Sequence, residues 1–96
     1  MLNIKTNPKA SIIIRSKNEE DWIGHCLNAV FSQSYENYEV IIVDNESEDK
    51  TLEIVKSYPV KKIVNLEKYL PGYAINEGIK KASGGIIVMI SSHCIP

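Results

Sequence analysis

Four short, mostly apolar runs along the chain each stop at polar residues, and this pattern constrains the fold more than any other feature. The runs are residues 12–14, 40–43, 62–64 and 86–90, and they are followed by Arg15, Asp44, Asn65 and Ser91. Runs without regular polar alternation are typical of parallel strands that are buried on both faces. Because parallel strands end at a common edge, we expect these polar side chains at one rim of a sheet. Open α/β sheets bind their ligands at that rim.

Segments with helical spacing separate the four runs. The first carries Trp22, Ile23, Cys26 and Leu27 at steps of three and four residues, which indicates one apolar helix face. Asn18 and Asp49 stand where N-caps are expected. The order of elements predicts an α/β fold, a doubly wound, Rossmann-like arrangement of four mostly parallel strands with helices on both faces. The predicted strands cover residues 11–15, 39–43, 61–65 and 86–90, and the predicted helices cover 18–33, 49–58 and 73–82.

Composition limits what the chain can bind. Its 96 residues make at most one small domain, and a net charge of −1 gives no reason to expect nucleic acid as a partner. No apolar stretch is long enough to span a bilayer, and residues 1–9 lack the apolar core of a secretory signal. We therefore predict a cytoplasmic protein with a flexible lead-in over 1–9 and a domain over 10–96. Since the last strand has no closing helix after it, we predict that this domain is truncated.

The residue types at the predicted rim favour a nucleotide-linked substrate. Neither a G-x-G-x-x-G turn nor a G-x-x-x-x-G-K-[ST] loop is present, which argues against a dinucleotide-binding dehydrogenase or a P-loop enzyme. Arg15 and Lys17 suit phosphate oxygens, and Glu19 and Asp44 suit the donors of a base or sugar. Each has a purely structural alternative. Asp44 would accept hydrogen bonds from its own loop, Glu19 would charge a helix start, and Arg15 would pair with an acid.

Four segments in order resemble the family 2 glycosyltransferases with the GT-A fold. Residues 11–20, SIIIRSKNEE, look like the opening strand and turn of that family, usually an apolar strand followed by Pro-Thr-Tyr-Asn-Glu. Residues 40–51, VIIVDNESEDKT, are similar to its Val-Asp-Asp-Gly-Ser-x-Asp-x-Thr segment. Residues 76–84, NEGIKKASG, and the strand up to Pro96 resemble the Asn-x-Gly helix and the strand that delivers Asp-x-Asp. The resemblance spans residues 10–96.

The resemblance implies transfer of a sugar from a nucleotide-diphosphate donor to an acceptor hydroxyl. By position, Ser16, Lys17 and Glu19 match the nucleotide-contacting turn, and Asp44 matches the acid that hydrogen-bonds the base. Ser91 and His93 match the two acids that hold a divalent cation, Mn²⁺ or Mg²⁺, on the diphosphate. The chain has Ser91-Ser92-His93 where the family has Asp-x-Asp, so His93 is the one candidate metal ligand there. We therefore expect Arg15 or Lys17 to offset part of the diphosphate charge.

The catalytic residue is unknown, since the family places its catalytic base well beyond the diphosphate motif, and we expect the 96-residue chain alone to be inactive. The acceptor, a glycan or a lipid-linked sugar, and the oligomeric state stay open. The intact protein is expected in the cytoplasm or at the inner membrane face. Two alternatives are a non-catalytic nucleotide-sugar-binding module and a receiver-like signalling domain in which Asp44 takes a phosphoryl group.

Overall fold

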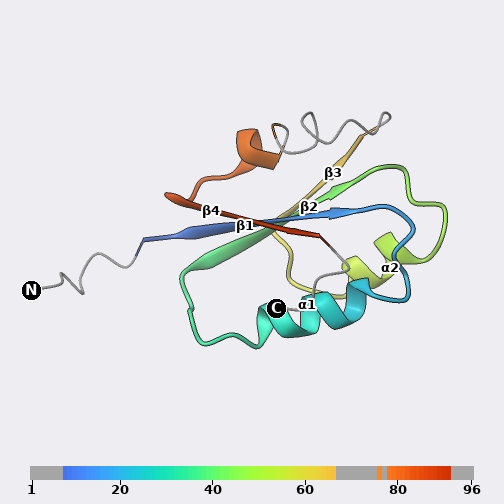
Figure 1. Cartoon of the computed structure of the whole chain (residues 1–96), viewed down its shortest axis with the longest axis horizontal. Helices are drawn as coiled ribbons and strands as arrows, with labels where there is room; N and C mark the ends of the chain where they lie inside the picture. Colours follow the sequence, from blue (N-terminus) through green and yellow to red (C-terminus); the bar gives the residue numbers. More distant parts are fainter. Residues whose placement is uncertain (1–7, 67–75, 77, 92–96) are drawn as a thin grey trace, which may run out of the picture.

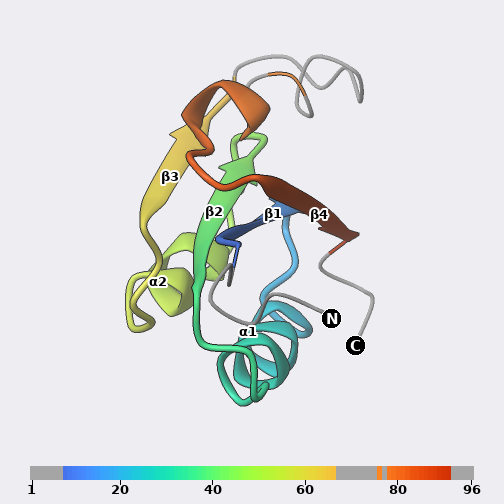
Figure 2. The same ribbon diagram turned by 90° about the vertical axis from the view of Figure 1, so that its left-hand side faces the viewer.

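The fold is a four-stranded parallel sheet with helices on both faces (Figure 1). The computed structural model describes residues 8–66, 76 and 78–91. The strands run in the order β3-β2-β1-β4, which Figure 2 shows from left to right. The predicted α/β class and the parallel sheet are confirmed. The elements are β1 (Ala10–Ser16), α1 (Ile23–Phe31), β2 (Tyr38–Asp44), α2 (Thr51–Val55), β3 (Lys62–Asn65) and β4 (Ile86–Ser91).

Each strand lies within two residues of its predicted bounds, because the apolar runs are the parts that the helices cover. Alternate β1 residues face opposite sides of the sheet. Ile12 and Ile14 pack with Val40 and Ile42 of β2 against α1 and α2. Ile13 packs with Ile41 and Val43 on the other face, next to Leu66 and Ala82. Figures 1 and 2 show α1 and α2 on one side of the sheet and the helical residues 78–81 on the other.

The helix that contains Gly78 lies very close to the sheet. A Cβ atom built on Gly78 would come within 2.6 Å of the Ile13 Cγ2 and 3.2 Å of the Val43 Cγ2. Glycine therefore lets this helix approach β1 and β2 more closely than alanine would. Residues 78–81 are helical, as predicted, and the rest of the predicted helix, apart from position 76 and the non-helical Ala82, lies outside the described residues.

The start of the first helix was predicted too early. α1 begins at Ile23 rather than after Asn18, and its N-cap position, Trp22, makes no side-chain capping hydrogen bond. Asn18 instead has a φ of 50°, in the left-handed region, and its side chain accepts a hydrogen bond from another loop. Trp22, predicted on the buried face, is 47% exposed, whereas Ile23, Cys26 and Leu27 are buried as expected.

Replacing Gly78 with alanine should destabilise the domain. The added methyl group would overpack the contact with Ile13, and overpacking costs about 1–3 kcal/mol, part of which alanine's higher helix propensity returns. Gly24 is the matched control, since its Cβ would meet only ordinary contacts at 3.7 and 3.9 Å. Urea denaturation of the intact protein should show Gly78→Ala less stable and Gly24→Ala more stable by up to about 1 kcal/mol. Equal gains in both variants would contradict the close packing.

Candidate functional site

The carboxyl ends of β1, β2 and β4 meet at one rim of the sheet. Ser16 is the register partner of Asp44, and Arg15 is the partner of Val43 on one side and of Ser91 on the other. Arg15 and Asp44 therefore lie at the same rim of the sheet, as expected from parallel strands, with the backbone of Ser91 next to Arg15. Their convergence with His93 on one donor site remains a prediction. His93, the candidate metal ligand, lies outside the described residues.

The carboxylate of Asp44 is fully buried and accepts hydrogen bonds from both sides. The Ser16 hydroxyl donates to Oδ1 at 2.6 Å, and the Ser47 hydroxyl donates to the same oxygen at 2.6 Å. The backbone N–H of Ser47 donates to Oδ2 at 2.9 Å. A buried carboxylate needs such partners, because an unpaired buried charge is strongly unfavourable. Asp44 thus joins the end of β1 to the loop that follows β2.

The loop after β1, residues 17–22, and the loop after β2, residues 45–50, are held together by reciprocal hydrogen bonds. We call these hydrogen bonds the loop junction. Asn18 donates its backbone N–H to the Ser47 hydroxyl at 2.9 Å, and its side-chain oxygen accepts the Glu48 N–H at 2.7 Å. The Glu20 carboxylate accepts the Lys50 N–H at 2.9 Å. Charged and polar loop residues therefore bond the backbone of the opposite loop, although these groups are exposed to solvent.

Asp49 and Thr51 complete the loop junction. The Asp49 carboxylate accepts the Thr51 N–H at 2.9 Å and the Glu20 N–H at 3.1 Å, while Thr51 accepts the Glu19 N–H at 2.7 Å. Desolvation would raise the pKa of Asp49, but the hydrogen bonds from Thr51 and Glu20 outweigh it and lower that pKa. Asp49 was predicted as the N-cap of this helix, but the N-cap position is Lys50, and Asp49 supports the start of α2 from one residue earlier.

A polar pocket of about 380 Å³ lies on the loop junction. Lys17 provides its cation, and Glu46 and Glu48 provide carboxylates around the polar side chains of Asn18 and Ser47. Lys17 is exposed, which leaves its ammonium group accessible to a ligand. The half-buried Glu19 and Arg15 lie beside this pocket along the chain rather than in its lining. Of the predicted contacts whose side chains the structure describes, Lys17 alone lines the pocket, and Ser16 and Asp44 belong to the hydrogen bonds at the base of the two loops.

Asn45 is a rim residue that the sequence reasoning missed. It follows Asp44 directly, is 4% exposed, and donates its backbone N–H to the Ser16 carbonyl at 2.9 Å. Its buried Oδ1 atom has no hydrogen-bond partner in the part of the chain that the structure describes. Buried polar atoms are nearly always paired, so an unpaired acceptor at a ligand-binding rim marks a candidate contact. The sequence feature that could have identified Asn45 as a contact is its amide side chain directly after Asp44, the acid that ends a buried strand.

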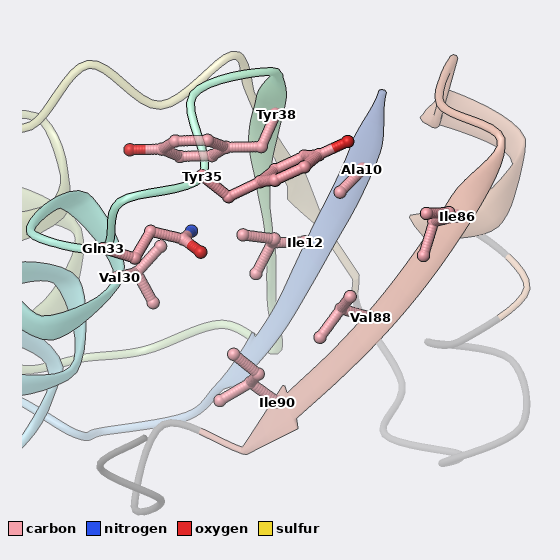
Figure 3. Close-up of a pocket in the computed structure, with 9 residues that line it drawn as sticks. All are labelled: Ala10, Ile12, Val30, Gln33, Tyr35, Tyr38, Ile86, Val88 and Ile90. Atoms are coloured by element: carbon pink, nitrogen blue, oxygen red, sulfur yellow. The ribbon is translucent and has the colours of Figure 1, made fainter. Parts of the chain in front are cut away.

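A second hollow of about 360 Å³ is apolar and lies between α1 and β4 (Figure 3). Ile86, Val88 and Ile90 of β4 face Ile12 and Val30 across it, and Tyr35, Tyr38 and Gln33 stand at its far side. The described residues that line it carry no carboxylate or cation, so they offer none of the groups that bind or transfer a charged substrate. The rim pocket is therefore the better candidate functional site.

Two further properties bear on the site. Among the described residues, no three His, Cys, Asp or Glu side chains form a group that would hold a metal ion. The described residues thus do not fit a metal site by themselves, and no chemical step is assigned to a metal here. A search of the described helices for a membrane span found none of sufficient length and hydropathy.

The fold and the rim define a parallel α/β protein with a polar ligand pocket at the ends of β1 and β2. The chain belongs to glycosyl transferase family 2, whose family model matches residues 11–96. A relative from Methanococcus voltae is 44% identical over 94 residues, which cover 90% of this chain and 29% of the relative. It is a dolichyl N-acetyl-alpha-D-glucosaminyl phosphate 3-beta-D-2,3-diacetamido-2,3-dideoxy-beta-D-glucuronosyltransferase. The chain thus spans under a third of that relative's length.

Solved structures show the same fold. Staphylococcus aureus TarS 1–349 in complex with UDP-GlcNAc superimposes with a TM-score of 0.82 at 32% identity, covering 88% of this chain and 26% of TarS 1–349. The mannosyltransferase PcManGT from Pyrobaculum calidifontis, in complex with GDP-Man and Mn²⁺, gives a TM-score of 0.78 at 25% identity. That match covers 90% of this chain and 28% of PcManGT. Family membership and the GT-A-like fold inferred from the four sequence segments are confirmed.

Glu46 occupies a strained position in the loop junction, and replacing it with glycine should stabilise the domain. Its φ is 50°, and it stands where the family pattern quoted above has glycine. A left-handed conformation costs a non-glycine residue roughly 1–2 kcal/mol, and the greater freedom of unfolded glycine offsets about half of the gain. We expect Glu46→Gly to raise the free energy of unfolding of the intact protein by about 0.5–1 kcal/mol.

Asn18 is the control for that substitution. Its φ is also 50°, but its side chain accepts the Glu48 N–H. Asn18→Gly should therefore show no gain, because the relief of strain is offset by the lost hydrogen bond. If Glu46→Gly gave no greater stability than Asn18→Gly, the strain assigned to Glu46 would be wrong.

Proposed function

We propose that the intact protein transfers a sugar from a nucleotide-diphosphate donor to an acceptor hydroxyl, and that this chain holds the donor nucleotide. The observation that carries the proposal is the open polar pocket at the ends of β1 and β2, with the Asn45 acceptor at the same rim, which has no partner among the described residues. Family membership and the nucleotide-sugar complexes of TarS and PcManGT support it. Ser16, Lys17, Glu19, Asp44, Ser91 and His93 remain the proposed contacts of the donor site, together with Arg15.

The hydrogen bonds around Asp44 and in the loop junction give these residues different roles. Asp44 is fully buried and already accepts three hydrogen bonds, so its first task is to hold the two loops in place. Asn45, one residue further on, has an acceptor to spare for an N–H of the donor base. Lys17 lines the pocket with an exposed ammonium group, which suits an oxygen of the diphosphate.

Binding of nucleotide sugars to the intact protein tests this proposal. Isothermal titration calorimetry with UDP- and GDP-sugars should show one donor that binds. Lys17→Ala should weaken that donor about ten-fold or more, because a hydrogen bond to a charged group is worth about 1.5–3 kcal/mol. Asn45→Ala should weaken it as well, through the base.

Lys61→Ala is the matched control. Lys61 is an exposed lysine next to the amino end of β3, so the variant changes the net charge equally but at the opposite edge of the sheet. It should bind the donor as the unaltered protein does. Equal losses of donor affinity for Lys17→Ala and Lys61→Ala would show that only the net charge of the protein matters, and would overturn the assigned pocket.

We further propose that the cations of the chain, Lys17 and Arg15, offset most of the diphosphate charge, and that His93 provides a weaker ligand for a divalent cation. The described residues contain no acidic cluster that would hold Mg²⁺ alone. A chelator should therefore lower the transfer rate of the intact protein only in part, and His93→Ala should remove that sensitivity. Complete inhibition that magnesium alone reverses would contradict this charge balance. Donor hydrolysis at the rate of a blank would instead favour a non-catalytic binding module.

A further inference from the structure

A buried carboxylate at the opposite end of the sheet holds β4 in place. Glu39, near the start of β2, is 6% exposed. Its Oε2 accepts the Ser11 hydroxyl at 2.6 Å and the Ser83 N–H at 2.7 Å. Its Oε1 accepts the Ser83 hydroxyl at 3.0 Å and lies 3.3 Å from the Lys9 Nζ. We call Lys9, Ser11, Glu39, Ser83 and Gly84 the Glu39 cluster.

The cluster is charged under physiological conditions. Burial alone would raise the pKa of Glu39, but the hydrogen bonds from Ser11 and Ser83 and the contact with Lys9 lower it to about 2. The ionised carboxylate is an acceptor only, and every donor around it comes from β1, from the residue before β1, or from the turn before β4. Glu39 therefore connects three segments that are far apart in the sequence.

Within the described part of the chain, the side chains of β4 constrain its register only weakly, since Ile90 is its one residue that packs against the core cluster. It is at the edge of the described sheet and pairs there with β1. Ile86, Ile87, Val88 and Met89 are all apolar and are 37–44% exposed, on both faces of the strand. Register is normally set by burying one face and exposing the other, and a strand without that contrast slips easily. A slip of two residues would leave every β4 side chain on its present face.

The Glu39 cluster supplies the missing constraint. The Gly84 N–H donates to the Ser11 hydroxyl at 2.8 Å, and the Ile86 N–H donates to the Lys9 carbonyl at 3.2 Å. A Cβ on Gly84 would lie 2.6 Å from the Lys9 oxygen and 2.7 Å from the Ser11 Oγ, so the backbone fits there only as glycine. The pairs that follow from this start run from Ala10 with Ile86 to Arg15 with Ser91.

We propose that Glu39 is a positioning residue for the donor site: it fixes the register of β4 against β1 and so places the backbone of Ser91 beside Arg15 at the rim. The effect on catalysis rests on the proposed function. The effect on the register of β4 rests on the Glu39 cluster alone. A two-residue slip would move the end of β4 by roughly 7 Å along the sheet. Misplacement by about 1 Å already costs on the order of a hundred-fold in rate.

The register is tested first, without donor. In the intact protein, nuclear Overhauser contacts between the backbones of β1 and β4 should report the pairing of Ile13 with Met89 and of Arg15 with Ser91. Glu39→Gln should weaken or shift these contacts and speed amide exchange in β4. Val55→Ala is the control, because Val55 is a fully buried core residue of α2, away from β4. It should lower stability and leave the pairing intact. Unchanged contacts and exchange in Glu39→Gln would overturn the proposal.

The kinetic measurement compares the same two variants at temperatures where both are equally folded. Glu39→Gln should lower kcat/KM for the donor roughly ten- to a hundred-fold, and Val55→Ala should stay within about two-fold of the unaltered protein. Equal effects would make Glu39 merely structural. If Glu39→Gln does not fold, Ser83→Ala replaces it, because Glu39 then keeps Ser11 and Lys9, and it should show a smaller change in the same direction. If the unaltered protein bound no nucleotide sugar, the proposed function would be wrong. The measurement of the β4 register would still test the role of Glu39.

Discussion

The buried carboxylate of Asp44 is the interaction on which the site depends. It lies at the end of β2, directly opposite Ser16 at the end of β1, and hydroxyl and backbone donors from both strands' ends converge on it. Without these donors a charge at this depth would be strongly unfavourable, so the carboxylate forces Ser16 and Ser47 to stay close. The two loops above it are then brought within reach of each other, and the remaining hydrogen bonds of the loop junction follow.

The polar motif residues therefore have two kinds of role. The side chains of Ser47, Asp49 and Thr51 form hydrogen bonds within and between the two loops. These three residues therefore hold the loops that form the pocket. Lys17 lines the pocket, and the side-chain oxygen of Asn45 has no partner in the part of the chain that the structure describes. At the other end of the sheet, the Glu39 cluster holds the start of β4 in the same way, with an acid whose partners Lys9, Ser11 and Ser83 come from two segments far apart in the sequence. Both buried acids fix the geometry of the rim, one from each end.

The fold could be predicted from sequence because β1 and β2 are buried on both faces and so read as unbroken apolar runs, and the runs at β3 and β4 repeat that pattern. The rim could be predicted for a related reason, since parallel strands bring Arg15, Ser16 and Asp44 to one edge whatever lies between them. The start of α1 could not, because Asn18 uses its amide oxygen on Glu48 in the other loop rather than on its own helix. Asn45 was missed for the same reason: an unpaired buried atom becomes visible only when all its neighbours are placed. The metal ligands and the contacts of His93 remain predictions.

Mapping the bound nucleotide on the intact protein tests the central claim most directly. Backbone amide shifts should be followed as the nucleoside diphosphate of the donor is added. We predict that the largest changes fall on Lys17, Asn45 and Glu46, around the pocket at the ends of β1 and β2, and that Lys61 and Lys62 at the other edge stay unchanged. Saturable changes confined to Lys61 and Lys62, with the rim unaffected, would contradict the account.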